Sequence, residues 1–209
     1  MVSKNGCFIV FEGIDGSGKS TQLSLLKEHI EEHSINCMTT MEPSNGPIGT
    51  LLRQFLSGRI KGEETTLTAL FAADRLDHLN NPVNGIRKLL EDGIAVISDR
   101  YVFSNYAYQS VSVPLEWIMK CNEMANEIVR PDCHIFIDVA PETAMDRVSK
   151  GRHQTDIYET LDRLTDVRER YLDLIHRMED VENIIIIDGN RPEKEIADDI
   201  WAKVCHYFV

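Results

Sequence analysis

The sequence predicts an α/β protein, built as a doubly wound five-stranded parallel sheet with helices on both faces. Three observations lead to this fold class. Five short apolar runs alternate with amphipathic segments along the 209 residues. Each run looks continuously apolar, which is typical of strands buried on both faces of a parallel sheet. A glycine-rich loop at 13–20 follows the first run directly. No tract has linker composition, so we expect one domain spanning 1–209.

The expected elements alternate along the chain. The first strand is the run Cys7–Phe11, and the helix after the loop carries its apolar residues on one face. Further strands are expected at 37–41, 94–98, 134–139 and 184–187. Helical patterns occupy about 47–57, 65–79, 115–128, 142–149 and 158–178. The last helix shows an apolar residue at every fourth position: Ile196, Ile200, Val204 and Phe208. Right-handed crossovers would place ligands at the carboxyl ends of the strands.

Charge and cysteine content narrow the functional classes. The 34 acidic residues outnumber the 22 basic ones, for a net charge of −12. Such a chain repels polyphosphate strands, so we expect no nucleic-acid partner. The five cysteines form no C-x-x-C pair and read as reduced thiols. No signal-peptide core and no apolar run near 18 residues is present, so we expect a cytoplasmic protein without a membrane partner.

Residues 13–20 match the pattern G-x-x-x-x-G-K-[ST] between a predicted strand and a predicted helix, the context that a phosphate-binding loop requires. Backbone N–H groups and the helix N-terminus would surround a polyphosphate. We expect Lys19 to reach the β- and γ-phosphates and the Ser20 hydroxyl to hold Mg²⁺. The sequence therefore predicts a nucleoside triphosphate site, formed by Gly13, Ile14, Asp15, Gly16, Ser17, Gly18, Lys19, Ser20 and Thr21.

An acid and a base, Asp99 and Arg100, directly follow the strand expected at 94–98. An acid at that position can hold Mg²⁺ through water, and an arginine beside it can clamp phosphate oxygens bidentately. The alternative is a structural salt bridge between the two. A guanine-reading Asn-Lys-x-Asp motif is absent from the sequence, which argues against a GTPase.

Several motifs, taken together and in order, resemble those of the thymidylate kinase family. They are Phe11–Thr21, Glu42-Pro43, Leu70–Arg75, Asp99–Tyr101, Ser104–Gln109, Arg130–Asp132 and Asp156–Glu159. They span most of the chain and are more specific than the loop alone. The resemblance implies the P-loop nucleoside monophosphate kinase fold and a homodimer. It also implies transfer of the γ-phosphoryl group of Mg-ATP to dTMP, giving dTDP and ADP for dTTP biosynthesis.

The resemblance assigns residues to the dTMP site. Phe71 corresponds to the ring that stacks on thymine, and Arg75 to the guanidinium that bonds its exocyclic oxygen. Their spacing from Leu67 puts all three on one helical face. Asn105 lies where some members bond thymine N3, and an amide can both donate and accept there. The remaining assignments are Tyr108 under the sugar, Asp15 at the 3′-hydroxyl, Arg53 and Arg100 on the acceptor phosphate, and Ser104 and Gln109 in the pocket lining.

This sequence lacks arginines at two positions where members of the family carry them, so other residues must supply the positive charge. The segment around Glu42-Pro43 lacks the arginine that many relatives place there, which leaves Arg53 as the substitute, with a solvated surface arginine as the alternative. The phosphate loop has no arginine either. We expect the missing cation from a lid at about 147–157, with Arg152 as the catalytic residue, Lys150 as the weaker candidate and Arg147 beside the adenine. A solvated basic loop is the alternative.

Three other functions stay open on this sequence. One is a kinase for another nucleoside monophosphate, and a second is a deoxynucleoside kinase, although its Glu-Arg-Ser arrangement is absent. The third is a non-enzymatic, nucleotide-dependent switch. His29 and His33 lie four residues apart but lack the glutamate of H-E-x-x-H, so we expect no metal site there.

Overall fold

A single parallel sheet organises the chain. The computed structural model describes residues 6–151, 158 and 160–208. Within them, the strands pair in the order β2-β3-β1-β4-β5, and every pairing is parallel. The strands are β1 (Phe8–Glu12), β2 (Cys37–Met41), β3 (Ala95–Asp99), β4 (Cys133–Asp138) and β5 (Ile184–Asp188). The predicted fold class and its five strands are confirmed.

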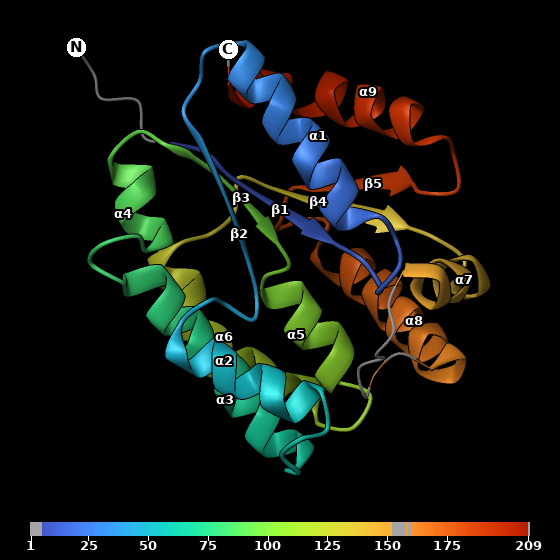
Figure 1. Cartoon of the computed structure of the whole chain (residues 1–209). Coiled ribbons are helices and arrows are strands. Elements are labelled where there is room, and N and C mark those ends of the chain that lie inside the picture. The colour runs from blue at the N-terminus through green and yellow to red at the C-terminus, as the bar shows by residue number, and fades with distance from the viewer. Residues whose placement is uncertain (1–5, 152–157, 159, 209) are drawn as a thin grey trace.

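Helices cover both faces of the sheet (Figure 1). Helices α1 (Lys19–Glu32) and α9 (Glu193–Val204) lie side by side on one face. The opposite face carries α3 (Glu64–Asn80), α5 (Val102–Gln109), α6 (Leu115–Ile128) and α8 (Leu161–Met178). The remaining elements are α2 (Pro47–Leu56), α4 (Ile86–Glu91), α7 (Pro141–Gly151) and a 3₁₀ turn at Cys205–Tyr207.

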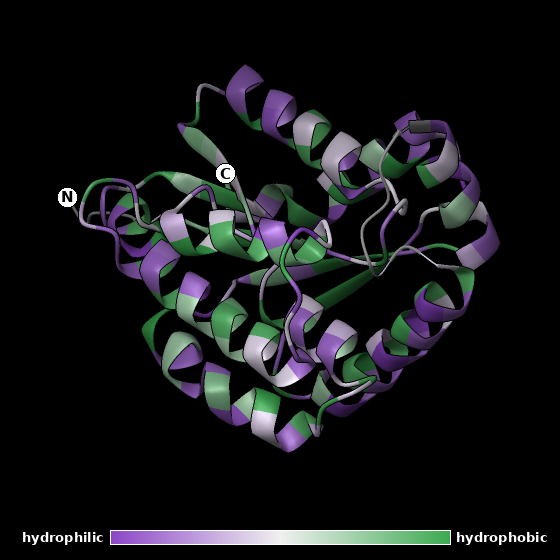
Figure 2. Ribbon diagram, turned by 60° about the horizontal axis from the view of Figure 1, so that its bottom comes forward, coloured by the Kyte–Doolittle hydropathy of each residue, from purple (hydrophilic) through white to green (hydrophobic). Residues whose placement is uncertain are grey.

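The core lies between the sheet and these helices. Residues of the three central strands β1, β3 and β4 are almost entirely buried, and Figure 2 shows the strands largely green against helices with polar outer turns. The edge strands differ: Met38 and Met41 of β2 are 47% and 48% exposed, and Ile186 of β5 is 52% exposed. The prediction that every strand is buried on both faces is therefore wrong for β2 and β5, because side chains at the edges of the sheet are covered less completely by the packed helices than those at its centre.

Helix α8 starts later than the expected residue 158. The side chain of Thr160 caps it by accepting a hydrogen bond from the Arg163 backbone N–H at 3.3 Å, so helical geometry begins at Leu161. Tyr158 therefore lies ahead of the helix and is buried.

The C-terminal helix is shorter than the four-residue spacing indicated. Helix α9 ends at Val204, and a 3₁₀ turn follows. The ring of Phe208 lies outside the helix and stacks on Trp201, with 6.0 Å between ring centroids. Two helices, α4 and α5, were not predicted. Helix α5 is short and buried on nearly every side, so it has no polar face to reveal a helical period.

Two cysteine thiols lie within the sheet. Burial raises the pKa of Cys37 in β2 to about 11 and the pKa of Cys133 in β4 to about 12, so both stay protonated near neutral pH. Among the described helices, none combines the length and the apolar composition that crossing a membrane would need.

Candidate active site

Two adjoining pockets open at the carboxyl ends of the strands. The first, here the loop pocket, has a volume of about 380 Å³ and is lined by Asp15, Gly16, Gly18, Lys19, Ser20, Thr21, Met41, Glu42, Asp99, Arg100, Arg147 and Val148. The second, here the aromatic pocket, has a volume of about 290 Å³ and is lined by Asp15, Met41, Glu42, Pro43, Arg53, Leu56, Phe71, Arg75, Arg100, Tyr101, Ser104, Asn105, Tyr108, Gln109 and Tyr158. The two share Asp15, Met41, Glu42 and Arg100.

The phosphate loop has the conformation that its glycines allow. Gly13, Gly16 and Gly18 have φ angles of 142°, 81° and 96°, a region that side chains disfavour. Lys19 folds back over the loop, and its Nζ donates to the carbonyl oxygens of Gly13 at 3.0 Å and Ile14 at 2.9 Å. Burial, aided by the Arg100 charge, lowers the pKa of Lys19 to about 8. An ammonium group thus stands at the centre of the loop.

Ser20 and Asp99 meet as the predicted metal site requires. The Ser20 hydroxyl donates to Asp99 Oδ2 at 2.8 Å. The other carboxylate oxygen, Oδ1, is buried and has no hydrogen-bond partner in the described part of the chain. Hydroxyl and carboxylate oxygens are ligands that Mg²⁺ prefers, and an unpartnered buried oxygen can bond to a metal-bound water. These two residues therefore fit the expected ion.

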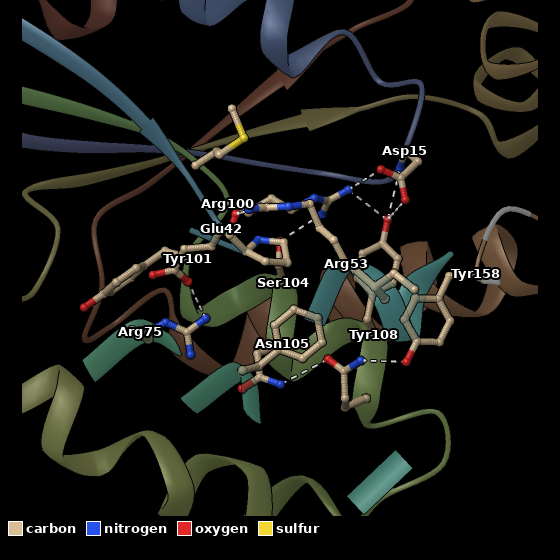
Figure 3. Close-up of a pocket in the computed structure, with 15 residues that line it drawn as sticks. Asp15, Glu42, Arg53, Arg75, Arg100, Tyr101, Ser104, Asn105, Tyr108 and Tyr158 are labelled. Atoms are coloured by element: carbon tan, nitrogen blue, oxygen red, sulfur yellow. Dashed lines mark hydrogen bonds and ion pairs between the residues drawn. The ribbon is translucent and has the colours of Figure 1, made fainter. Parts of the chain in front are cut away.

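Arg100 stands where the two pockets meet (Figure 3). Its Nη2 donates to Asp15 Oδ1 at 2.6 Å and to the Tyr108 hydroxyl at 3.0 Å, and its Nη1 donates to Ser104 Oγ at 2.9 Å. The guanidinium carbon also lies 4.8 Å from the centre of the Tyr108 ring. Its ion pair is with Asp15, so the alternative of a salt bridge between Asp99 and Arg100 is wrong.

The charge on Asp15 is firmly held. Burial acts to raise the pKa of this carboxyl, but the Arg100 and Lys19 charges and the Tyr108 hydrogen bond outweigh it and keep the pKa well below its usual range. The Tyr108 hydroxyl donates to Asp15 Oδ2 at 2.9 Å. Asp15 is thus an ionised acceptor between the two pockets.

Glu12, a buried residue to which the sequence analysis assigned no role, holds residues that contact or follow Arg100. Glu12, at the end of β1, is fully buried and accepts hydrogen bonds from the Tyr101 backbone N–H at 2.9 Å, Ser104 Oγ at 2.6 Å and the Tyr171 hydroxyl at 2.9 Å. Burial raises its pKa. An acid ending an otherwise apolar strand was the available signal, but its partner Tyr171 lies 159 residues away.

The floor of the aromatic pocket is polar. Arg75 is 1% exposed, donates to Glu42 Oε2 at 2.6 Å and lies 5.1 Å from the centre of the Tyr101 ring. Asn105 donates to Gln109 Oε1 at 3.0 Å, as Figure 3 shows. The structure therefore brings together at one pocket the predicted residues Arg53, Phe71, Arg75, Arg100, Ser104, Asn105, Tyr108 and Gln109.

Arg53 lies at the side of this pocket and donates through Nη1 to the Pro43 carbonyl at 2.8 Å. Glu42 and Tyr158 also line the pocket, although the sequence indicated no role for either beyond belonging to a motif. Their role appears only once distant segments come together, since Tyr158 bonds to Gln109 across 49 positions of the chain.

The expected lid is only partly described. Arg147 donates to the Gly189 carbonyl at 3.1 Å and lies against the phosphate loop, 3.5 Å from the carbonyl oxygens of Gly16 and Ser17. Helix α7 continues to Gly151, past the expected end at 149. Lys150 is therefore still helical, and its side chain pairs with Asp146, one turn back on the same helix, at 2.6 Å. Arg152 lies outside the described residues.

The histidine pair on α1 packs against a tryptophan. The ring centroids of His29 and His33 lie 5.5 Å and 4.9 Å from that of Trp201. Among the described residues, no group of three or more potential metal ligands was found.

A loop that surrounds phosphates requires a second pocket if it is to transfer a phosphoryl group to another molecule. This chain has that second pocket, which shares Arg100 and three other lining residues with the first, and the arrangement defines a P-loop kinase with a small-molecule acceptor. The chain belongs to the thymidylate kinase family, whose model, described as thymidylate kinase, matches residues 11–200. The recognition made from the motifs is confirmed.

Individual relatives are similar in sequence to this chain over most of their length. The thymidylate kinase of Symbiobacterium thermophilum is 37% identical over 202 residues, which cover 92% of this chain and 90% of the relative. The probable thymidylate kinase of Methanococcus aeolicus is 37% identical over 94% of this chain and 95% of its own. The probable thymidylate kinase of Methanocaldococcus jannaschii is 38% identical over 90% of this chain and 89% of its own. The chain is thus an enzyme of this kinase family.

Proposed function

We propose that this protein transfers the γ-phosphoryl group of Mg-ATP to dTMP, forming dTDP and ADP on the route to dTTP. One observation carries the proposal: Arg100 lines both the loop pocket and the aromatic pocket. A donor phosphate on the loop and an acceptor phosphate in the aromatic pocket would both face its guanidinium. Its Nη atoms could then share their donors between the two phosphates.

The proposed mechanism depends on position and charge. Lys19 and Arg100 neutralise phosphate oxygens while the dTMP phosphate attacks in line, and that phosphate is already anionic near pH 7, so no strong general base is needed. Asp15 orients Arg100 and accepts from the sugar 3′-hydroxyl. Ser20 and, through water, Asp99 would hold Mg²⁺, which when bound neutralises the triphosphate.

The acceptor is recognised at the aromatic pocket. Phe71 stacks on the thymine, Arg75 and Asn105 bond its edge, and Tyr108 lies under the sugar. Arg53 acts with Arg100 on the acceptor phosphate, and Ser104 and Gln109 complete the lining. The aromatic walls suit a planar base, since stacking one base on an aromatic ring is worth about 1–3 kcal/mol.

The lid completes the donor side. Arg147 lies beside the adenine, in keeping with its place against the phosphate loop. Arg152, or Lys150 in its place, supplies a cation to the γ-phosphate when the site closes. Arg152→Ala should lower kcat at least about tenfold with little change in the KM for dTMP, because a single arginine of this kind is worth about 10³ to 10⁵ in rate.

Acceptor-stimulated release of ADP tests the proposed function. Turnover should be highest with dTMP among dTMP, dCMP, dGMP and UMP, and Phe71→Ala should raise the KM for dTMP. A nucleotide-dependent switch would show no stimulation by any acceptor. Equal turnover of dTMP and dCMP by the unaltered protein would contradict the proposed specificity.

We further propose a cytoplasmic homodimer, on the ground of the family resemblance. Light scattering at micromolar concentration should give twice the mass of one chain. A monomeric mass would overturn the dimer without affecting the assigned reaction.

A further inference from the structure

A continuous chain of hydrogen bonds runs beneath the aromatic pocket. Arg75 Nη1 donates to Asn122 Oδ1, and Asn122 Nδ2 donates to Asn105 Oδ1 at 2.8 Å. Asn105 Nδ2 donates to Gln109 Oε1 at 3.0 Å, and Gln109 Nε2 donates to the Tyr158 hydroxyl at 3.2 Å. That hydroxyl donates to Glu64 Oε2 at 2.9 Å. We call these residues the amide chain: Arg75, Asn122, Asn105, Gln109, Tyr158 and Glu64.

The two ends of the amide chain have opposite and unchangeable polarity. A guanidinium has only donors, and an ionised carboxylate has only acceptors. Both ends lie on α3, with Glu64 at its start and Arg75 eleven positions later, while α5 and α6 contribute the amides between them. Arg75 is held from its other side by the Glu42 carboxylate. Neither end can exchange donor for acceptor.

This polarity orients every amide in between. The atom of Asn122 that faces Arg75 has to be its oxygen, so its NH₂ group faces Asn105. Asn105 therefore presents its oxygen to Asn122 and its NH₂ group to Gln109. Turning any one amide over would set two oxygens or two NH₂ groups against each other in a buried place, which costs about 1–3 kcal/mol per unsatisfied group. The orientation of Asn105 thus does not depend on the ligand.

The fixed orientation matters because Asn105 and Arg75 both line the pocket, and in the proposed function both read the base. The Asn105 oxygen lies on the side of Arg75, so the pocket offers a donor next to an acceptor. Thymine has the complementary edge, an acceptor at O4 and a donor at N3–H. Cytosine reverses both, with a donor at N4 and an acceptor at N3. An asparagine free to turn over could adapt to cytosine at N3.

We propose that Asn122 is a positioning residue that locks the Asn105 oxygen beside Arg75 and so makes the pocket reject cytosine. Asn122 is fully buried, does not line the pocket, and is itself held by donating to the Ile118 carbonyl at 2.9 Å. It acts on the base through Asn105. This inference rests on the proposed function of dTMP phosphorylation.

Asn122→Asp tests the lock. Aspartate can still accept from Arg75 but, when ionised, cannot donate to Asn105, so the Asn105 amide turns over to offer its NH₂ group. Gln109 turns over with it, and the Tyr158 hydroxyl then donates to Gln109 in place of the half-buried Glu64. The ratio of kcat/KM for dTMP to that for dCMP should fall at least about tenfold, the size expected when a buried hydrogen-bond pattern no longer opposes the wrong ligand. The ratio for dTMP to dUMP should stay unchanged, because uracil and thymine share the same edge.

Asn126→Asp is the matched control. It makes the same chemical change one turn further along α6, where Asn126 donates to the Tyr106 hydroxyl at 3.0 Å outside the amide chain. Both ratios should stay as in the unaltered protein. If thermal melting shows that Asn122→Asp does not fold, Asn122→Ala, which releases Asn105 without adding a charge, should lower the dTMP-to-dCMP ratio in the same direction.

A folded Asn122 variant that loses dTMP and dCMP turnover equally would overturn the inference, because it would reveal a structural role only. An unchanged dTMP-to-dCMP ratio would overturn it as well. Failure of the proposed function would be seen separately, in the unaltered protein, as an absence of turnover with dTMP.

Discussion

Arg100 has a backbone conformation that few residues other than glycine adopt, with φ of 75°. Its N–H donates to the Phe11 carbonyl at 2.9 Å, and the next N–H, of Tyr101, donates to the buried carboxylate of Glu12. These bonds hold the turn after β3 and direct the guanidinium back over the phosphate loop. Such strain of roughly 1–3 kcal/mol persists where the surroundings enforce it.

Lys19 should make ATP affinity fall as the pH rises. Burial lowers its pKa to about 8, so in the free protein the ammonium becomes neutral above that pH, whereas the nucleotide phosphates keep their charge. We expect the Kd for ATP to rise between pH 7.5 and 9.5, by about tenfold per pH unit at most. Calorimetric titration with ATP at several pH values measures this.

Lys19→Met is the control for that effect. It should bind ATP weakly at pH 7.5, and the Kd should hardly change up to pH 9.5, since the titrating group is gone. If the Kd for ATP of the unaltered protein stays constant over this pH range, the affinity for ATP does not depend on the Lys19 charge.

At the scale of elements, two glycines of the phosphate loop should respond differently to alanine. Both have positive φ, but a Cβ at Gly16 would lie 2.2 Å from the Ala144 carbonyl oxygen of α7, whereas the nearest neighbour of one at Gly18 is Arg147 Nη1 at 4.0 Å. Gly18→Ala should cost about 1–2 kcal/mol of stability from backbone strain alone. Gly16→Ala should cost at least about 1 kcal/mol more, because the loop and α7 must separate.

Urea unfolding of the two glycine variants provides the comparison. Equal loss of stability would mean that the contact between the loop and α7 adds nothing to the cost of Gly16→Ala. The side chain of Arg147 extends from α7 to the phosphate loop. Because Gly16→Ala would push α7 and this side chain away from the loop, it should also weaken ATP binding more than Gly18→Ala does.

The start of α8 depends on one side chain. Thr160→Ala removes the cap on the Arg163 N–H and should lower the free energy of unfolding by about 0.5–2 kcal/mol. Thr160→Ser keeps the hydroxyl and should stay close to the unaltered protein. Chemical denaturation measures both, and an equal loss for Ala and Ser would show that the methyl group, not the cap, stabilises the helix.

At the scale of the whole molecule, a buried histidine should make the fold sensitive to acid. His134 in β4 is 1% exposed and stacks on Phe103 with 4.3 Å between ring centroids, and burial lowers its pKa to about 3. Its folded pKa lies below the ordinary value near 6.5, so below that pH the unfolded chain binds a proton that the folded chain does not. Stability therefore falls as the pH drops, by ~2 kcal/mol between pH 7 and pH 5 from this residue.

His134→Phe should remove that part of the pH dependence. Glu182 lies 3.9 Å from the ring, and burial raises the pKa of its carboxyl, so its own opposite contribution remains in the variant. The quantity to compare is the change in unfolding free energy from pH 7 to pH 5. A His134→Phe variant with the same dependence as the unaltered protein would contradict the assignment.

Much of the predicted fold and of the predicted phosphate site rested on local sequence patterns. The phosphate loop and the strand that precedes it are contiguous in the chain, so backbone geometry and spacing suffice to place Gly13, Lys19 and Ser20. The residues of the aromatic pocket came from a resemblance and not from spacing, since they lie on separate helices. The ion pair of Arg100 was missed, because Asp15 is 85 positions away.

The alternation of strands and helices, the parallel sheet and the phosphate loop follow from the amino-acid sequence without any knowledge of tertiary contacts, because they depend on short-range periodicity and on glycine conformation. Which strands lie at the edges, which acid pairs with Arg100, and how Asn122 orients Asn105 become apparent only in the folded protein. Such choices depend on burial and on the donors and acceptors left by residues far away in the chain. A hydrogen bond between Arg75 and Asn122 spans 47 positions, and no local pattern records which partner a buried polar group will meet.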